Sequence, residues 1–328
     1  MNRGHFLGPA RLTAVGFILL ILVGTLLLML PISANVPQWT PFLPALFTAT
    51  SAVSLTGLVV EDTGTYWTSF GQAVIIALIQ LGGLGIMSLA SLSGMLLTGR
   101  ISFKARRTMA AEGRAVASGG IRRALLLTVV MTLICEAIVA VFIGVRLATE
   151  HGVAPGRAAW EGVFHAISAF NNAGFSTYSD SVISFAADGW ILLPLAFALI
   201  IGGLGYPMLA EFVRRARARL TRWRGGTPRI HRMSMTARMT LGATAFLLLG
   251  GTVIFFLSEG SGVLNGMPLG QKLINAFFMS ASPRTAGFNA IDYGEAHPLT
   301  LMVTDILMFI GGGSAGTAGG TKGTTFFL

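Results

Sequence analysis

The sequence predicts an all-α integral membrane protein built from repeated units. The 328 residues are 53% hydrophobic and 11% charged, whereas ordinary soluble domains carry about 25% charged residues. Apolar runs long enough to cross a bilayer recur six times along the chain. Two glycine-containing motifs, one polar stretch and one Gly-Gly pair, recur in phase three times along the chain. Together, composition, apolar length and internal repetition favour a helical bundle in a membrane.

The six apolar runs are the predicted membrane-spanning helices. A helix needs roughly 20 apolar residues to cross a bilayer core about 30 Å thick. The runs cover residues 12–30, 70–97, 121–148, 188–210, 236–258 and 299–312. The first run ends in "LMLPISANVP" rather than in a small-x-small cleavage site, so we interpret it as a retained helix and not as a signal peptide.

The distribution of charge predicts the orientation. Sixteen of the 23 Lys and Arg residues lie in two segments, seven in 100–123 and nine in 214–238. Acidic residues such as Glu61, Glu150 and Asp292 lie in the intervening segments. The positive-inside rule then predicts a multi-pass membrane protein with a cytoplasmic N-terminus. Because the positive charge alternates with acidic segments along the chain, the net charge of +10 reflects membrane topology and does not indicate a nucleic-acid partner. The basic segments are expected either to bind anionic lipid headgroups or to dock a cytoplasmic protein.

Three stretches of the chain align with one another. They are "TATSAVSLTGLVVED" from residue 48, "HAISAFNNAGFSTYSD" from residue 165 and "FMSASPRTAGFNAID" from residue 278. Their glycines Gly57, Gly174 and Gly287 are 117 and 113 residues apart, and Gly-Gly pairs begin 25, 28 and 24 residues later. The chain is thus divided into repeat 1 (1–100), repeat 2 (101–225) and repeat 3 (226–328), each expected to be helix, pore loop, helix.

A half-length apolar segment precedes each of these glycines. The segments cover residues 39–53, 157–170 and 269–282, which is too short to span a bilayer and suits a re-entrant helix. Irregular backbone at membrane depth is tolerated where it is buried in protein or lines a water-filled cavity. Glycine allows backbone angles that turn successive carbonyls toward an axis, and rings of carbonyls replace the hydration shell of a cation. The units are therefore expected to surround a central ion pore, although helix capping and close packing alone would also use these small residues.

These motifs resemble the Trk/Ktr/HKT superfamily of potassium uptake proteins, and within it the ion-conducting Ktr-type (KtrB-like) subunit. The resemblance is carried by "ATSAVSLTGL", "SAFNNAGFST", "SASPRTAGFN" and "GGGSAGTAGGTK" and covers essentially the whole chain. It implies four helix/pore-loop/helix repeats around one potassium pathway. The chain ends at "KGTTFFL", so three of the four repeats are present and the fourth is absent. We therefore interpret the chain as an incomplete one.

The resemblance assigns the ion-filter and the gate. The filter maps onto Ser54, Leu55, Thr56 and Gly57, onto Asn171, Asn172, Ala173 and Gly174, and onto Arg284, Thr285, Ala286 and Gly287. The gate maps onto a loop that interrupts the second helix of repeat 3, here residues 311–323, which we call the gate segment. Its assigned residues are Gly311, Gly312, Gly313, Ser314, Gly316, Gly319, Gly320 and Lys322. Many glycines make a continuous helix costly there, at roughly 1 kcal/mol each, although a plain structural loop would have the same composition.

The same resemblance implies the function and the partners. It implies potassium uptake across the plasma (inner) membrane without catalytic chemistry, a homodimer, a cytoplasmic nucleotide-binding regulatory subunit (KtrA/TrkA-like) and no cofactor. Potassium is the transported ion, and sodium is an activating ion in some members. A non-conducting membrane scaffold or assembly subunit is the alternative, and a secondary transporter for organic solutes is a weaker one. Glu136 and Asp305 lie inside predicted spans and are expected either to bond between helices or to bind ions. The lone Cys135 and the five scattered histidines indicate no metal site.

Overall fold

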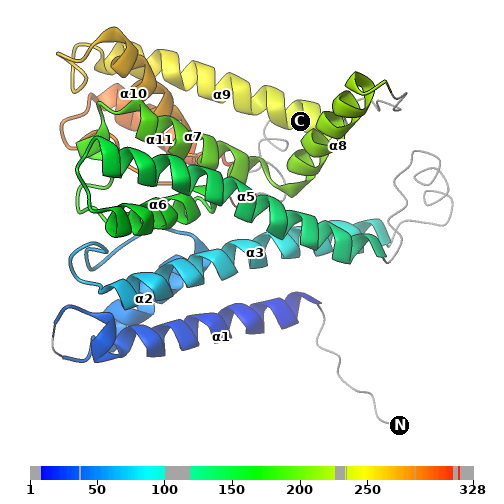
Figure 1. Cartoon of the computed structure of the whole chain (residues 1–328), viewed down its shortest axis with the longest axis horizontal. Helices are drawn as coiled ribbons and strands as arrows, with labels where there is room; N and C mark the ends of the chain where they lie inside the picture. Colours follow the sequence, from blue (N-terminus) through cyan, green and yellow to red (C-terminus); the bar gives the residue numbers. More distant parts are fainter. Residues whose placement is uncertain are drawn as a thin grey trace.

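The computed structural model describes residues 9–36, 38–99, 119–225, 233, 235–284, 286–312 and 317. Within these residues the secondary structure is helical, apart from one isolated bridge between Ala34 and Trp67. The long helices α1, α3, α5 and α9 run alongside one another, and the short helices α2, α6 and α10 gather toward one end of the molecule (Figure 1). This arrangement confirms the predicted all-α fold.

The helices follow the predicted order in each third of the chain. The first third holds α1 (Pro9–Met29), η1 (Pro31–Ser33), α2 (Phe42–Ser54) and α3 (Ser69–Gly99). The second holds α5 (Gly119–Thr149), α6 (Pro155–Phe170), η2 (Ile183–Phe185), α7 (Gly189–Leu204) and α8 (Tyr206–Trp223). The last holds α9 (Met235–Glu259), α10 (Leu269–Ala281) and α11 (Pro298–Phe309). The three half-length segments are thus short helices of 13, 16 and 13 residues.

One predicted span is wrong in its extent. The apolar run 188–210 is not one helix, because α7 ends at Leu204 and α8 begins at Tyr206 in a new direction (Figure 1). Gly205 between them has φ 82° and ψ 164°, backbone angles that essentially only glycine adopts. Pro207 follows in the first turn of α8, where its missing N–H costs no helical hydrogen bond. The sequence "GYP" therefore ends one helix and starts another.

The outer faces of the long helices carry apolar side chains. On α1 the exposed residues include Ile18, Leu22 and Leu26, and on α9 they include Phe246 and Leu257. Soluble proteins rarely expose apolar stripes of this extent. Among the residues whose side chains are described, Leu126–Thr149 and Ala237–Glu259 are long and apolar enough to cross a membrane, and the remaining apolar helices are shorter. The outer surface of the helices is thus apolar, as contact with lipid acyl chains requires.

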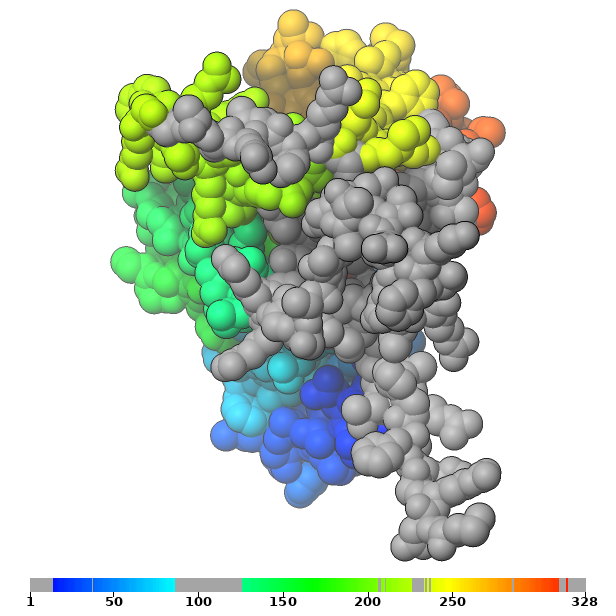
Figure 2. All heavy atoms as spheres, turned by 90° about the vertical axis from the view of Figure 1, so that its right-hand side faces the viewer, coloured from blue at the N-terminus to red at the C-terminus, as the bar shows by residue number. Residues whose placement is uncertain are grey.

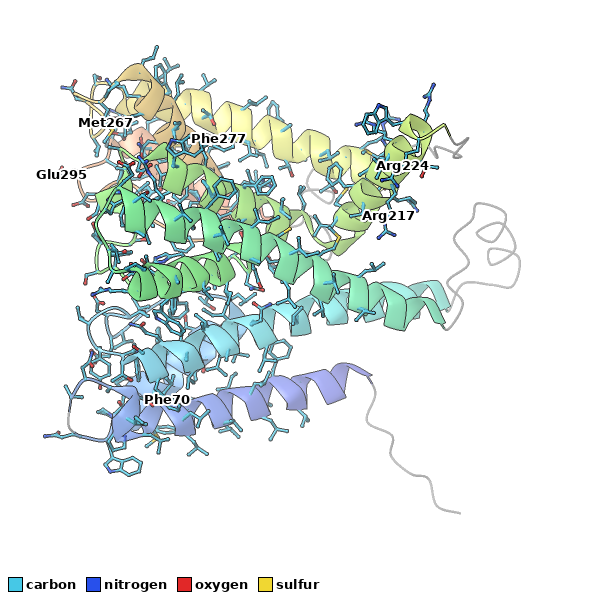
Figure 3. All side chains as sticks on the ribbon, in the orientation of Figure 1. Phe70, Arg217, Arg224, Met267, Phe277 and Glu295 are labelled. Atoms are coloured by element: carbon cyan, nitrogen blue, oxygen red, sulfur yellow. The ribbon has the colours of Figure 1, made fainter. Side chains whose placement is uncertain are left out.

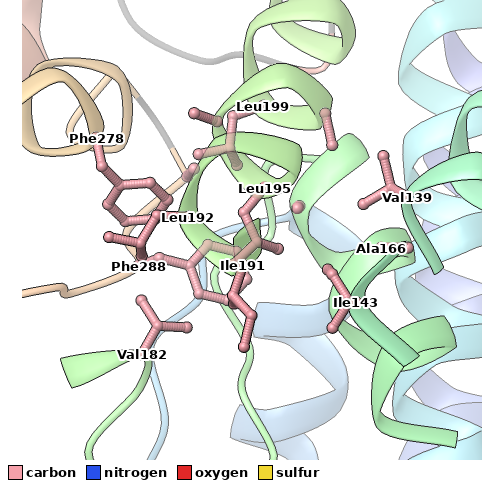
Figure 4. Packing of buried hydrophobic residues seen from close by; sticks show 14 of the residues in the cluster. Val139, Ile143, Ala166, Val182, Ile191, Leu192, Leu195, Leu199, Phe278 and Phe288 are labelled. Atoms are coloured by element: carbon pink, nitrogen blue, oxygen red, sulfur yellow. The ribbon is translucent and has the colours of Figure 1, made fainter. Parts of the chain in front are cut away.

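Buried residues join the repeats to one another. One cluster combines Leu192, Leu195 and Leu199 of α7 with Phe278 of α10 and with Phe288 (Figure 4). A second cluster combines the helices of repeat 1 with residues of repeat 2, namely Phe164, Ala173 and Phe175. Repeat 2 therefore packs against both of its neighbours, which brings the ends of the three short helices together.

Candidate ion pathway

Each short helix ends in the loop that the sequence singled out. We call these loop 1 (54–57), loop 2 (171–174) and loop 3 (284–287), of which Thr285 lies outside the described residues. Gly57, Gly174 and Gly287 have φ values of 79°, 73° and 76°, in the left-handed region that favours glycine. The three loops thus share one backbone turn, and this turn explains why glycine recurs at these positions.

The loops contact one another through their backbones. A Cβ built on Gly57 would lie 2.4 Å from the carbonyl oxygen of Ala173 in loop 2. A Cβ on Gly174 would lie 2.2 Å from the carbonyl oxygen of Ala286 in loop 3. Both carbonyls belong to the residue that precedes the loop glycine. Gly57 and Gly174 therefore each make room for the equivalent carbonyl of the next loop, so that the loops contact one another in the order 1, 2, 3.

Hydrogen bonds hold the loop backbone in place. Ser168 Oγ donates to the carbonyl of Phe175 at 2.7 Å, and Ser282 Oγ donates to the carbonyl of Phe288 at 2.6 Å. The accepting residue follows the loop glycine in both repeats. The N–H that precedes the glycine donates to a serine carbonyl in all three loops, at 2.9, 2.8 and 2.9 Å. These bonds orient the loop peptides without using the carbonyls of Ala173 and Ala286.

The Gly-Gly pairs support the loops from behind. A Cβ on Gly82 of α3 would lie 2.2 Å from the carbonyl oxygen of Val53, and a Cβ on Gly202 of α7 would lie 1.7 Å from that of Phe170. Val53 and Phe170 occupy equivalent positions, four residues before the loop glycine. These two pairs therefore give close packing of the second helix on the end of the short helix.

The side chain three residues before each loop glycine differs among the repeats. Ser54 bonds locally, with Thr56 Oγ1 at 2.6 Å. Asn171 Nδ2 reaches Gln80 of α3 at 3.0 Å and Glu136 of α5 at 3.2 Å. Glu136 therefore accepts a bond between helices, one of the two roles predicted for it. Asp305, the other acid in a predicted span, is exposed.

The loops also differ in their exposure. Asn171, Asn172 and Ala173 of loop 2 are buried, whereas Ser54 and Thr56 of loop 1 and Gly287 of loop 3 are exposed. A Cβ on Gly287 would meet nothing within 4 Å. In this chain loop 2 is therefore flanked on both sides, and loops 1 and 3 are each flanked on one side only.

The gate segment is described at Gly311, Gly312 and Thr317. Its other assigned residues lie outside the described residues, namely Gly313, Ser314, Gly316, Gly319, Gly320 and Lys322. Asn172 Nδ2 of loop 2 donates to Thr317 Oγ1 at 2.9 Å, and Thr317 Oγ1 lies 3.3 Å from the carbonyl of Phe170. Sequence reasoning missed Thr317, although it is the first residue of the gate segment with both a hydroxyl and a β-methyl.

Arg284 makes a second contact between a loop and the gate segment. Its Nη2 donates to the carbonyl of Gly311 at 3.3 Å. The guanidinium is buried, and its Nε has no hydrogen-bond partner among the described residues. It lines a small cavity of about 20 Å³ together with Asn172, Thr244 and Gly312. Loops 2 and 3 are therefore each bonded to the gate segment.

A buried polar group that the sequence did not predict braces the chain after loop 2. Glu161 of α6 is 2% exposed, and its carboxylate accepts from Arg157 Nε at 2.7 Å and from the hydroxyl of Tyr178. His165 Nε2 lies 2.9 Å from Ser176 Oγ. The described residues include no group of three or more His, Cys, Asp or Glu placed to hold a metal ion. These side chains thus fix the segment 175–178 against α6.

Short helices that end in contacting glycine turns are typical of membrane proteins with pore loops. The family model described as "TrkH: Cation transport protein" matches residues 12–328. The chain belongs to this family, whose members transport cations and are not enzymes.

Three curated relatives cover nearly all of the chain. It is 39% identical to "Ktr system potassium uptake protein B" of Bacillus subtilis over 98% of this chain and 69% of the relative. It is 37% identical to the protein of the same name from Vibrio alginolyticus, over 97% and 68%. It is 35% identical to "Potassium/sodium uptake protein NtpJ" of Enterococcus hirae, over 97% and 68%. The chain spans about two thirds of the length of each.

A solved structure supports the fold. The potassium transporter TrkH from Vibrio parahaemolyticus matches with a TM-score of 0.71, over 100% of this chain and 62% of that one, at 18% identity. At this identity the likeness shows the fold alone.

Proposed function

We propose that the protein takes up potassium across the plasma membrane, through a pathway whose external filter is formed by loops 1, 2 and 3. The observation that carries the proposal is the contact of Gly57 with the Ala173 carbonyl and of Gly174 with the Ala286 carbonyl. It supports a filter because the carbonyls of loops 2 and 3 lie against the glycines of loops 1 and 2, and rings of carbonyls replace the water around a potassium ion. The names of the relatives agree with potassium as the ion.

The proposed filter consists of backbone rather than of side chains. The serine-to-carbonyl bonds of Ser168 and Ser282 keep the loop peptides from rotating. Conduction requires binding strong enough for the ion to enter and weak enough for it to leave. One glycine turn per loop gives few layers of carbonyls, so we expect moderate discrimination against sodium. Sodium is then a candidate activating ion as well as a competitor.

The gate segment is proposed to obstruct the pathway beneath the filter. In support, two filter loops bond to it, loop 2 through Asn172 to Thr317 and loop 3 through Arg284 to Gly311. Each bond stabilises the obstructing position, by about 1 kcal/mol for a neutral pair and about 1.5–3 kcal/mol for a charged donor. Displacing the segment would break both bonds, so that the filter loops hold the gate shut.

The orientation and the assembly are also part of the proposal. The two basic segments support a multi-pass protein with its N-terminus in the cytoplasm. The names of two relatives describe a Ktr system, which supports work in a complex. The homodimer and the cytoplasmic nucleotide-binding regulatory subunit are what the family resemblance implies. We expect that subunit to act on the gate segment and not on the filter.

Uptake of rubidium and sodium tests the proposed function. The protein is produced in bacterial cells that lack their own potassium uptake systems, and both ions are measured with membrane abundance. We expect rubidium uptake that exceeds sodium uptake and restores growth at low potassium. Normal membrane abundance without uptake of either ion would contradict the proposal and would favour a non-conducting scaffold.

A further inference from the structure

The helix α8 is rich in arginine, whereas the helices that it contacts are mainly apolar. At 100° per residue, the large apolar side chains from Leu209 onward, together with Ala216, fall within an arc of about 100°. They are Leu209, Phe212, Val213, Ala216, Leu220 and Trp223. Five arginines, at positions 214, 215, 217, 219 and 222, lie outside this arc, and Arg224 follows the helix. The helix is therefore amphipathic and strongly basic.

Only the beginning of α8 is packed in the bundle. Met208 and Leu209 are buried, and Met208 packs with Leu204 of α7 and Ala237 of α9. Further along the same apolar arc, Phe212 is 40% exposed, Leu220 46% and Trp223 87%. One continuous apolar stripe thus starts inside the protein and emerges on its surface. Nothing among the described residues covers its far end.

The position of α8 favours an interfacial setting. It begins just after the apolar helix α7 ends, close to the point where Gly202 packs against the end of α6, and it is inclined to the long helices α5 and α9 (Figure 1). Seen from that end of the molecule, α8 lies at the periphery rather than in the middle (Figure 2). Arg217 and Arg224 lie on the part of the helix that stands away from the bundle (Figure 3). The exposed, arginine-bearing end of α8 therefore lies at the periphery of the molecule, where the level of the lipid headgroups suits its charge.

Most of the positive charge of α8 has no acidic partner in the described part of the chain. The ion pair found there joins Arg215 to Glu211 at 3.5 Å. Arg215, Arg219, Arg222 and Trp223 line a surface hollow of about 580 Å³. Guanidinium groups bind phosphate oxygens bidentately, and an indole ring prefers the membrane interface. The hollow therefore combines the groups that recognise a phosphate attached to an apolar chain.

We propose that α8 lies on the cytoplasmic surface of the bilayer and binds anionic phospholipid headgroups. Leu220 and Trp223 enter the boundary between headgroups and acyl chains, while Arg215, Arg219 and Arg222 bind the phosphates. Basic helices with Trp and Leu on the apolar face bind membranes in this way. A protein partner would need to cover the rim of the molecule, where lipid already surrounds the bundle. The proposal needs the membrane location of the chain and is independent of the transported ion.

Quenching by brominated lipids tests this placement. In a Cys135→Ser background, Leu220→Cys and Thr221→Cys each carry an environment-sensitive fluorophore. Position 220 belongs to the apolar arc, and position 221 lies about 100° further round the helix, on the basic face. The protein is reconstituted in phosphatidylcholine alone or mixed with phosphatidylglycerol, with bromine on the acyl chains. We expect strong quenching at 220 and weak quenching at 221, with the contrast largest in the anionic bilayer.

Removing arginines tests the headgroup contact. Each of Arg219→Gln and Arg222→Gln is expected to lower the ratio of docked to undocked helix by about fivefold in the anionic bilayer. High salt is expected to act in the same direction, because it screens exposed charges. Thr221→Gln, a polar change that removes no charge, serves as the control for folding and should leave quenching at 220 unaltered.

Three outcomes would overturn the proposal. Equal quenching at 220 and 221 would show that the apolar stripe does not face lipid. Equal quenching in neutral and anionic bilayers would show that α8 does not depend on anionic headgroups for its position. Protection of position 220 only when a cytoplasmic protein is added would identify α8 as a protein-docking helix. Ion uptake is not measured here, so failure of this proposal and failure of the transport function are distinguishable.

Discussion

Replacing Gly174 by alanine tests the contact between filter loops directly. The added Cβ would lie 2.2 Å from the Ala286 carbonyl oxygen, whereas Cβ contacts below 3.0 Å essentially never occur. The two loops must therefore separate by at least 0.8 Å, the difference between these distances. The obstacle is backbone and not a flexible side chain, so the carbonyl itself has to move. The left-handed φ of 73° adds about 1–2 kcal/mol of strain.

Gly266→Ala is the matched control. Gly266 has φ +83°, and a Cβ there would meet nothing within 4 Å. This variant suffers the same backbone strain at a distance from the filter. Any excess effect of Gly174→Ala over Gly266→Ala therefore reports the displaced carbonyl. Gly57→Ala, whose Cβ would lie 2.4 Å from the Ala173 carbonyl, should behave like Gly174→Ala.

The assay measures rubidium and sodium uptake together with membrane abundance. We expect both variants to lower the rubidium preference about tenfold, which corresponds to ~1.4 kcal/mol in the difference between the two ions. Gly174→Ser should give the same direction of change. The control should keep the preference of the unchanged protein. If Gly174→Ala keeps normal selectivity at normal abundance, Gly174 serves packing only and the filter assignment is refuted.

The remaining predictions concern the gate, the pH dependence and the orientation. Thr317→Val removes the hydroxyl that bonds to Asn172 and should raise ion flux about fivefold, from ~1 kcal/mol per bond. Thr252→Val is its control, because that hydroxyl bonds within its own helix. Equal flux in both variants would refute the proposal that the Asn172–Thr317 hydrogen bond holds the gate segment in place. Burial raises the pKa of Asp188, but hydrogen bonds from Arg146, His151 and the Trp190 N–H outweigh it, so the pKa is lowered. Its stabilisation is thus present above the ordinary carboxylate pKa of about 3.9 and lost as the pH falls through the folded value. Asp188→Asn should lower the melting temperature at pH 7 and weaken its decline toward pH 3.5 in detergent. An unchanged decline would contradict this. Arg222→Cys should resist an impermeant thiol reagent added outside cells, whereas Asp62→Cys should react, and the reverse pattern would overturn the orientation.

The sequence predicted the backbone of the candidate pathway better than its side-chain contacts. The short helices and their glycine turns follow from local requirements, since apolar length and a left-handed φ are properties of a few consecutive residues. The extent of α7 was wrong because an apolar run was interpreted by length alone. The break depends on one residue, Gly205, and on the proline two positions later.

The contacts that sequence reasoning missed join residues far apart in the chain. Thr317 and Asn172 are 145 residues apart, and Glu161 bonds to Tyr178 across the end of a helix and a loop. No periodicity relates such partners, because their pairing depends on how the repeats pack. Internal repetition predicts equivalent positions, but it does not predict which of them carry different side chains for different tasks.

This difference suggests that the backbone and the side chains of the loops have separate roles in ion coordination and in contacts with other elements. The turns at Gly57, Gly174 and Gly287 are nearly identical in φ, so the three loops offer the same backbone turn to a common pathway. The side chains three residues earlier are Ser54, Asn171 and Arg284, and each bonds to a different element. If the backbone coordinates the ion, these side chains are free to diverge without changing the ion that is bound. Their divergence then links loop 2 to α3 and α5 and loop 3 to the gate segment, so that selectivity and gating can change independently.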